Sequence, residues 1–314
     1  MDFVTFIILN WNKADSTVEA IENLEKFEQG NFGIIVVDNG SDDTEKEKLV
    51  RFFNKNHWPI IDEGENPKSR SGRFLILAKE NYGYAKGNNI GLKVAKFMGY
   101  SWAVVMNNDV LLVEPVLETL LELASSDRRI GIIGPKVVGP NGKRQSFNFK
   151  PGIYSFLMYP LLFPILFPVN IARKKLLFKK TNRHGISYPY SIIGCFMLVN
   201  LYVMEEIGWF DEKTFLYAEE VILSERLLRA GYRVAYTEKV LVRHLHSAGV
   251  TTLSKNRAKN EIPSFLYYFK EYRKYGRIRL SLVCFGYLYK LYFIAPLVRV
   301  LKSVLTILKS VFKG

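Results

Sequence analysis

The sequence predicts an α/β domain with a mostly parallel sheet and helices on both of its faces. Short apolar runs alternate with helical segments along residues 1–110, which is typical of βαβ units. Each apolar run ends in a cluster of Asn, Asp and Gly, most clearly at residues 102–110, which read WAVVMNNDV. Ligands of open α/β sheets bind beyond the carboxyl ends of the strands, so these clusters are candidates for one shared site. Turn formation is the alternative for any single cluster, because turns favour the same residues.

The first βαβ unit is predicted from two buried strands and a helix. Residues 3–9 and 33–37 are apolar enough for strands that are buried on both faces. Between them, apolar residues recur three apart and predict a helix over 16–27, with Asp15 or Ser16 as its cap. The sequence contains neither G-x-G-x-x-G after the first strand nor a P-loop, so a nucleotide must be held in another way.

The same alternation continues through the middle of the chain. A polar linker with Gly and Pro precedes a third strand at 74–77, and a helix over about 90–97 leads to the strand at 102–106. Beyond the Asn-Asn-Asp cluster we expect an amphipathic helix over 116–124 and a strand over 130–138.

The next segments predict further strands and a helix that carries acidic residues. Residues 191–200 are typical of a strand with a glycine break, and a helix opens within residues 215–220. A strand at 240–242 is followed by His244 and His246, which strand alternation places on the same face. An ordinary surface or core histidine remains the alternative for either one.

Seven segments follow one another in order: ILNWN, VVDNGSDD, NYGYAKGNN, MNND, GCFMLVN, GWFDEKTFLYAEE and RAGYRVAY. Together, over about residues 3–247, they resemble inverting family 2 glycosyltransferases with a GT-A (Rossmann-like) fold, in particular rhamnosyltransferase-like members. The resemblance implies a nucleotide-diphosphate-sugar donor, a divalent cation (Mn²⁺ or Mg²⁺) and a hydroxyl acceptor. We therefore expect a GT-A domain over 1–250, with a nucleotide-sugar-binding half over 1–112 and an acceptor and catalytic half over 113–250.

The resemblance also assigns residues to the donor site. Asn10, Trp11 and Asn12 would line the pocket of the base, and Asp38 would accept a hydrogen bond from the ring N–H of the base. The remaining nucleotide-sugar contacts would come from Asn81, Lys86, Asn88 and Asn108.

The same resemblance implies a metal site after the strand at 102–106. Asp109 matches the last Asp of the family's D-x-D motif and would bind the cation that bridges the diphosphate. Asn107 stands in place of the first Asp of that motif, which leaves fewer negative ligands for the metal. His244 or His246 would supply a further ligand to the metal or a contact to the phosphate.

Glu219 and Glu220 are the candidate catalytic acids. Adjacent glutamates at a helix N-terminus are ordinarily favourable partners of the helix dipole. By resemblance, the second acid of the pair is the general base, so Glu220 would take the proton of the acceptor hydroxyl. Many relatives carry a further Asp where this chain has Ile222, which blurs the acceptor assignment. The Q-x-x-R-W motif of processive members is missing from the sequence, so we expect one addition per encounter.

Residues 156–169 are an apolar segment without charge that lies outside these motifs. Prolines at positions 160, 164 and 168 should prevent a regular helix there, and a helix of this length would not cross a bilayer. Six Lys and Arg follow within residues 173–183 without an acidic residue. Such a segment could dip into the interface of an anionic leaflet; the alternative is an apolar insertion that packs on the sheet.

The C-terminal region, residues 251–314, carries 13 Lys and Arg against two Glu, a net charge of +11 within the chain's total of +14. Over residues 297–312 the polar positions form one narrow stripe with only positive charges, and the rest of the predicted helix is apolar. No charge-free run reaches the ~18 residues of a membrane span. We predict a basic, amphipathic, membrane-associating tail; a core helix or a homo-oligomer contact is the alternative. The large apolar face suits nucleic acid poorly, so we expect no nucleic-acid partner.

These observations predict an inverting, non-processive glycosyltransferase that moves one sugar from a UDP- or dTDP-sugar to a hydroxyl of a glycan acceptor, which we expect to be lipid-linked. Two cysteines are too few for a disulfide framework, and no secretory signal precedes the first strand, so we expect a peripheral protein on the cytoplasmic side of the cell membrane. A non-catalytic nucleotide-sugar-binding protein or a nucleic-acid-binding protein is the alternative.

Overall fold

The computed structural model describes residues 4–67, 72–145, 147–179, 181–182, 184–245 and 255–298 of the 314-residue chain. The chain divides into two compact units. One, the α/β unit, comprises residues 1–149 and 180–247, and the other, the helical unit, comprises residues 150–179 and 248–314. The apolar segment at 156–169 therefore belongs with the C-terminal region, whereas the predicted division had placed it inside the first domain.

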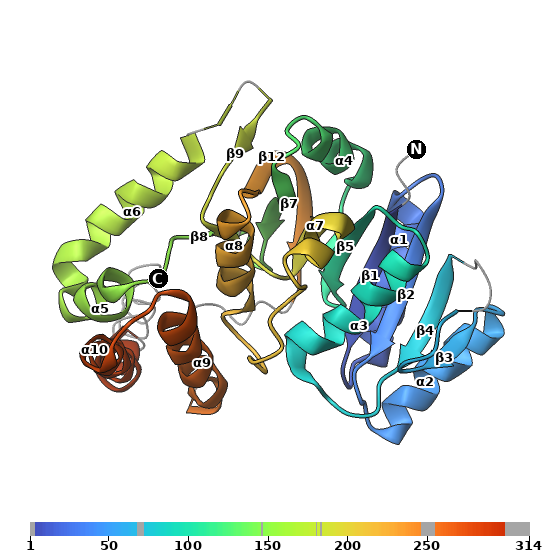
Figure 1. Cartoon of the computed structure of the whole chain (residues 1–314), viewed down its shortest axis with the longest axis horizontal. Coiled ribbons are helices and arrows are strands. Elements are labelled where there is room, and N and C mark those ends of the chain that lie inside the picture. The colour runs from blue at the N-terminus through green and yellow to red at the C-terminus, as the bar shows by residue number, and fades with distance from the viewer. Residues whose placement is uncertain are drawn as a thin grey trace, which may run out of the picture. The chain divides into compact units, whose positions relative to one another are not determined.

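The described part of the α/β unit is built on a ten-stranded, mostly parallel sheet in the order β3-β4-β2-β1-β5-β11-β7-β12-β6, with β9 beside β12 (Figure 1). The strands from β3 to β5 are all parallel, β7 and β12 are parallel to each other, and β11, β6 and β9 run antiparallel to their neighbours. The predicted fold class is confirmed. The strands of this sheet are β1 (Val4–Asn10), β2 (Phe32–Asp38), β3 (Ile60–Asp62), β4 (Arg73–Leu77), β5 (Trp102–Asn107), β6 (Val110–Leu112), β7 (Ile130–Val138), β9 (Ile186–Ser187), β11 (Phe196–Asn200) and β12 (Arg233–His244).

Helices cover both faces of this sheet. Helices α1 (Ala14–Phe27), α2 (Asp43–Lys55) and α4 (Leu117–Ser125) contribute to one core with alternate residues of the central strands, such as Phe6 and Ile8 of β1. Helix α3 (Gly83–Phe97) packs on the other face, where a Cβ at Gly91 would lie 2.7 Å from Ile7 Cγ2. This close approach allows α3 to lie against β1, because glycine has no side chain to hold the helix away.

The three central strands end together. In the parallel register Asn10 pairs with Asp38, and Leu9 pairs with Asn107. The polar clusters that follow β1, β2 and β5 therefore meet at one edge of the sheet, as the sequence predicts.

Several helices begin elsewhere than the sequence predicts. Helix α1 begins at Ala14, so neither Asp15 nor Ser16 is its cap; instead Glu45 Oε2 accepts a hydrogen bond from the Ala14 N–H at 2.7 Å. Helix α2 lies where a polar linker was expected, and it is capped by Asp42, which accepts from the Glu45 N–H. It buries little apart from Leu49 and Phe53, which explains its weak apolar signal.

Helix α3 begins at Gly83 rather than near residue 90. Its first turn is fixed by one neighbouring and one distant partner: Asn81 Oδ1 accepts from the Gly83 N–H at 2.9 Å, and the Phe215 carbonyl accepts from the Tyr84 N–H at 2.9 Å. The polar residues Tyr84 to Asn89 are therefore helical, although their composition is that of a loop.

The second half of the α/β unit follows the prediction closely. Strand β7 has the predicted bounds, and the predicted strand at 191–200 is divided into β10 (Ser191–Ile192) and β11 around Gly194; β10 pairs with β8 (Phe147–Asn148) in a separate two-stranded sheet. Helix α7 (Leu201–Glu206) follows β11, and α8 (Glu219–Arg229) begins after Tyr217 and Ala218, which both adopt positive φ. Strand β12 is longer than expected and ends at His244.

The helical unit, described by itself, contains interrupted helices. In the apolar segment, π-helix η1 (Tyr154–Met158) and α5 (Tyr159–Leu161) are separated by a turn from α6 (Phe163–Lys179), which contains Pro168. The expectation that prolines prevent a regular helix is thus correct at the turn between α5 and α6. It is wrong for α6, which continues through Pro168. The later elements are α9 (Lys255–Tyr267), η2 (Tyr268–Tyr272), α10 (Arg277–Tyr289) and η3 (Lys290–Ile294). Most of the predicted amphipathic helix at 297–312 lies outside the described residues.

Gly83 is predicted to be essential for folding, because both its backbone conformation and its close packing require glycine. Its φ is +78°, and an added Cβ would collide with the carbonyl oxygen of Phe215. Gly83→Ala should lower the free energy of unfolding by about 3 kcal/mol or more, measured by denaturant unfolding of the full chain. Gly99 is the matched control: its φ is +87°, but a Cβ there meets nothing within 4 Å, so Gly99→Ala should cost only about 1 kcal/mol. Equal losses in the two variants would contradict the packing argument.

Candidate active site

A buried amide, Asn10 at the end of β1, is the centre of a polar network. Its Nδ2 donates to Asp38 Oδ1 at 2.8 Å and to Ser41 Oγ at 3.1 Å. Its Oδ1 accepts from Thr17 Oγ1 at 2.8 Å and from Asn108 Nδ2 at 3.1 Å. One side chain therefore connects the ends of β1 and β2, helix α1 and the turn after β5.

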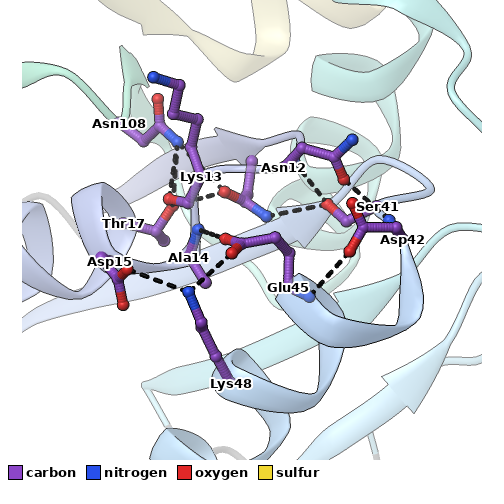
Figure 2. A network of polar contacts seen from close by, with 11 residues as sticks. Asn12, Lys13, Ala14, Asp15, Thr17, Ser41, Asp42, Glu45, Lys48 and Asn108 are labelled. Carbon is purple, nitrogen blue, oxygen red and sulfur yellow. Dashed lines mark hydrogen bonds and ion pairs between the residues drawn. The ribbon is translucent and has the colours of Figure 1, made fainter.

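The loops around this network are held by further hydrogen bonds, which Figure 2 shows. Asn12, whose φ is +51°, donates its N–H to Ser41 Oγ at 2.9 Å and accepts from the Asp42 N–H at 2.8 Å. Trp11 is more than half exposed beside these buried groups. Of the residues assigned to the base, Asn10 and Asp38 are thus fully buried, and Trp11 and Asn12 lie at the surface.

Asn81 and its neighbours fix the loop that leads into α3. Asn81 Oδ1 accepts from Asn39 Nδ2 at 3.0 Å, and Asn39 Oδ1 accepts from the Tyr82 N–H at 3.1 Å. The ammonium group of Lys86 lies 3.3 Å from the centroid of the Tyr82 ring. Asn81 thus has a local structural role, and Lys86 is held close to the surface of the same loop.

Two asparagines of α3 have different roles. Asn88 is fully buried; its Nδ2 donates to the Tyr84 carbonyl, and its Oδ1 has no hydrogen-bond partner among the described residues. Asn89, which the sequence argument did not assign, accepts from the Phe210 N–H at 3.0 Å and donates to the Phe210 carbonyl at 3.0 Å. It therefore fastens the loop before Glu219 to α3. Sequence reasoning missed Asn89 because this residue lies before the helix that was predicted at about 90–97.

The same loop is fixed from α8 by Arg226. Its Nη1 donates to the carbonyls of Gly208 and Trp209 at 3.0 and 2.9 Å, and its Nη2 lies 3.4 Å from Asp211 Oδ2. The sequence argument missed this residue as well, because only the fold brings it to the loop. Residues 208–211 are consequently held from two helices.

The turn after β5 separates Asn108 from Asp109. Asn108 Nδ2 also donates to Thr17 Oγ1 at 3.0 Å, so this side chain points toward α1 and stabilises the turn. Asp109 Oδ1 lies 3.1 Å from His244 Nε2, and His244 Nδ1 lies 3.2 Å from Gln145 Oε1. The structure thus brings Asp109 and His244 together as the sequence predicts, while His246 lies outside the described residues.

Asp109 and His244 are suitable ligands for a divalent cation, because carboxylate and imidazole groups both bind Mn²⁺-type ions. Their ligand atoms already lie at hydrogen-bond distance from each other, at the edge where β5 and β12 end. In the described part of the chain no third His, Cys, Asp or Glu completes a group around them. The remaining ligands of a bound ion would therefore be water or oxygen atoms of a substrate.

Gly194, at the break between β10 and β11, lies against Glu220. Its N–H donates to Glu220 Oε1 at 3.2 Å, and its carbonyl accepts from the Tyr84 hydroxyl. A Cβ at this position would lie 2.9 Å from Glu220 Oε1 and 3.1 Å from the Tyr84 hydroxyl. Only glycine therefore lets the Glu220 carboxylate and Tyr84 approach the strand break together.

Cys195, next to Gly194 in the strand break, is influenced by the charges of both Asp109 and Glu220. Burial raises the pKa of the Cys195 thiol, and the negative charges of Asp109 and Glu220 raise it further. The Cys195 carbonyl accepts from the Asn107 N–H at 2.9 Å, which ties the break to the end of β5. Asp109, which follows β5, and Glu220, which belongs to α8, thus come from different elements to one region of the sheet edge.

Glu219 differs from Glu220 in its surroundings. It is 5% exposed, and its Oε2 has no hydrogen-bond partner among the described residues. Burial, with a smaller contribution from the charge of Glu220, raises the pKa of Glu219 to about 8. Glu219 is therefore protonated at neutral pH, whereas Glu220 accepts a hydrogen bond from the Gly194 N–H.

Glu219 should make the stability of the fold depend on pH. The folded chain keeps the Glu219 proton up to about pH 8, whereas the unfolded chain releases it near the ordinary pKa of 4.5. The free energy of unfolding should therefore fall between pH 4.5 and 8, by on the order of 1 kcal/mol per pH unit. Glu219→Gln should remove this loss, so its stability relative to wild type should be greater at pH 8 than at pH 5 in thermal unfolding. The exposed Glu122→Gln is the control, and a constant difference in both variants would contradict the buried neutral state.

Comparisons with known proteins find relatives for much of the chain. The family model described as "Glycosyl transferase family 2" matches residues 5–184, more than half of the chain. N-acetylglucosaminyl-diphospho-decaprenol L-rhamnosyltransferase of Mycobacterium tuberculosis is 30% identical over 155 residues, which are 47% of this chain and 48% of that protein. Poly-beta-1,6-N-acetyl-D-glucosamine synthase of Staphylococcus aureus is 20% identical over 241 residues, 75% of this chain and 48% of that protein. The chain spans about half the length of the curated relatives it matches.

A solved structure shares the fold. The crystal structure of GalNAc-T7 with UDP, GalNAc and Mn²⁺ superposes with a TM-score of 0.60 at 14% sequence identity. The match covers 87% of this chain and 49% of that one. At this identity the likeness extends to the fold alone.

Proposed function

Since the chain belongs to glycosyl transferase family 2, we propose that it is an inverting, non-processive glycosyltransferase that transfers one sugar from a UDP- or dTDP-sugar to a glycan hydroxyl. The observation that supports this most is that two carboxylates from different elements come to one strand break. Glu220 of α8 accepts from the Gly194 N–H, and Asp109 follows β5, whose Asn107 N–H donates to the Cys195 carbonyl. A displacement at an anomeric carbon needs a group that stabilises the leaving diphosphate and a base on the acceptor. The two carboxylates are suited to these separate tasks.

The donor would bind at the shared end of β1, β2 and β5. Trp11 and Asn12 are accessible there and would contact the base, while buried Asp38 would offer its remaining acceptor capacity to the ring N–H. Uracil and thymine both present such an N–H, which is why we propose a UDP- or dTDP-sugar. Lys86, whose ammonium lies beside the Tyr82 ring, would contact the nucleotide from α3.

Asp109 and His244 would hold a divalent cation, Mn²⁺ or Mg²⁺. When bound, such an ion supplies Lewis-acid stabilisation of the leaving nucleoside diphosphate. Because Asn107 is neutral, Asp109 is the one carboxylate that the motif offers to the cation. Oxygen atoms of the diphosphate would supply further ligands. Gln145, beside His244 Nδ1, would keep the imidazole oriented with Nε2 toward the ion.

Glu220 would act as the general base. It takes the proton of the acceptor hydroxyl as that oxygen bonds to the anomeric carbon and the bond from this carbon to the diphosphate oxygen breaks. Attack from the side opposite the leaving group inverts the anomeric configuration. The Gly194 N–H holds Glu220 Oε1 in place, and the positive φ of Tyr217 (+73°) and Ala218 (+67°) sets where α8 begins.

The acceptor is proposed to be a lipid-linked glycan intermediate of cell-surface polysaccharide synthesis. The name of the M. tuberculosis relative describes rhamnosyl transfer to a decaprenol-linked amino sugar, and the S. aureus relative is a polysaccharide synthase. Rhamnose is therefore one candidate for the transferred sugar. A lipid-linked acceptor would require the protein to work beside a membrane.

We further propose that the helical unit holds the protein to an anionic membrane surface on its cytoplasmic side. Among the described residues, one helix, Arg277–Val298, is long and apolar enough to cross a bilayer by length and composition. The basic character of residues 251–314 would add attraction to anionic lipid headgroups. Contact between copies through the C-terminal helices is compatible with this proposal.

Glu220→Gln should lower turnover by roughly 10²-fold or more, because the amide keeps the shape of the side chain but cannot accept the proton. Binding of the nucleotide sugar should persist. The measurement is single-turnover transfer from a panel of UDP- and dTDP-sugars, with donor affinity determined in parallel by calorimetry.

Glu219→Gln is the matched control for this prediction. Because Glu219 is already neutral, its amide variant should retain most of the turnover. If Glu219→Gln proves the more damaging change, the assignment of the base within the pair is wrong.

A further inference from the structure

The helix Arg277–Val298 could be taken for a membrane span. It has 22 residues and a mean hydropathy of 1.5 in its most apolar stretch, and only 22% of that stretch is buried. At ~1.5 Å per residue it is about as long as the ~30 Å core of a bilayer. Length and composition therefore do not decide whether it crosses a membrane or lies along one.

One side of this helix is bound to the rest of the helical unit. Gly286 packs directly on the backbone of η1, where an added Cβ would collide with the Phe156 carbonyl oxygen. The Tyr287 ring stacks on Phe156 at 6.2 Å, and Val283 and Leu291 on the same side are buried. This side is therefore fixed against other helices of the same unit.

The bound side also carries a polar tie to α9. The Tyr287 hydroxyl donates to Glu261 Oε2 at 2.6 Å, and Arg257 Nε donates to the same oxygen at 2.7 Å. The Glu261 side chain is largely buried. Lys290 lies three residues beyond Tyr287. Burial lowers the pKa of Lys290, and the negative charge of Glu261 offsets part of this effect. A group of charged side chains is thus attached to the helix near its midpoint.

This tie argues against a crossing orientation. Tyr287 lies at the middle of residues 277–298, so in a span it would lie near the bilayer centre. Glu261 and Arg257 would have to follow it there, together with the other charged residues of α9. Ionised groups at that depth are costly and are rarely tolerated. An orientation in the plane of the membrane leaves α9 on the aqueous side.

The opposite side of the helix is an unpaired apolar surface, which we call the apolar face. Phe285, Tyr289 and Phe293 stack in a row, with ring centroids 6.3 and 5.2 Å apart. Residues of α5, α6 and the turn between them, which belong to the same unit, are also exposed and apolar. The apolar face comprises Ile278, Leu282, Phe285, Leu288, Tyr289, Tyr292 and Phe293.

Charge distinguishes between lipid and a second copy as the occupant of this surface. Residues 255–298 contain nine Lys and Arg against two Glu. Two copies meeting through this surface would bring like charges together, whereas an anionic leaflet carries the opposite charge. Amphipathic helices with basic residues beside an apolar face bind in the interface of a leaflet.

We propose that helix 277–298 lies in the plane of one anionic leaflet, with the apolar face in its acyl region and the Tyr287–Glu261–Arg257 tie toward water. This inference depends on the membrane association proposed above and adds its geometry. It predicts that the C-terminus of the chain is on the same side of the membrane as the α/β unit.

The test is protease accessibility in inverted membrane vesicles from cells that express the full chain with a cleavable epitope after Gly314. We expect the epitope and the α/β unit to be digested together without detergent. An epitope that is protected until detergent is added, while the α/β unit is digested, would overturn the in-plane orientation and leave membrane association itself intact.

A second measurement tests the occupant of the apolar face. Phe293 is 64% exposed, and Phe97 of the α/β unit is 62% exposed, so Phe293→Ser and Phe97→Ser are matched substitutions. Binding to vesicles that contain anionic lipid should weaken about tenfold in Phe293→Ser and remain unchanged in Phe97→Ser. Failure of the wild-type chain to bind would overturn membrane association altogether. Unchanged vesicle binding with conversion of a dimer to a monomer in Phe293→Ser would assign the face to a second copy.

Discussion

The hydrogen-bond network of Asn10 is the constraint on which the rest of the site depends. A buried amide must satisfy its donors and its acceptor within the protein, and Asn10 does so with Asp38, Ser41, Thr17 and Asn108. These partners come from the end of β2 and the loop after it, from α1 and from the turn after β5. The Asn108 bond holds that turn, and Asp109 follows directly at the edge of the sheet. The position of Asp109, the proposed metal ligand, thus depends on the side chain of Asn10 on another strand.

The fold could be predicted where the signal was local. Strands buried on both faces were visible as apolar runs, and their parallel order followed from the alternation with helices. Helix α2 was missed because it buries little apart from Leu49 and Phe53. The starts of α1 and α3 could not be predicted because distant groups stabilise them: Glu45 accepts from the Ala14 N–H, and the Phe215 carbonyl accepts from the Tyr84 N–H. Such partners exist only once the chain has folded.

The sequence indicated the charged residues of the candidate site, but it did not indicate the residues that hold its loops in place. The sequence indicated Asp109, His244 and the Glu219–Glu220 pair, and the fold places Asp109 beside His244 and buries Glu219. It did not indicate Asn89 or Arg226, which position the loop before the pair without any chemical signature of their own. Asn81 and Asn108, assigned to the donor by their motifs, also make hydrogen bonds that hold their loops: Asn81 to Gly83 and Asn108 to Thr17.

Binding of a nucleotide sugar across the ends of β1, β2 and β5 is the central claim, and amide hydrogen exchange of the full chain tests it most directly. With Mn²⁺ and a UDP- or dTDP-sugar, exchange should slow together at residues 10–12, 38–42 and 107–109. In Asp109→Ala the slowing that depends on Mn²⁺ should be lost, while the exchange of the ligand-free chain stays as in wild type. Slowing confined to other segments, or slowing in Asp109→Ala equal to that in wild type, would contradict the account.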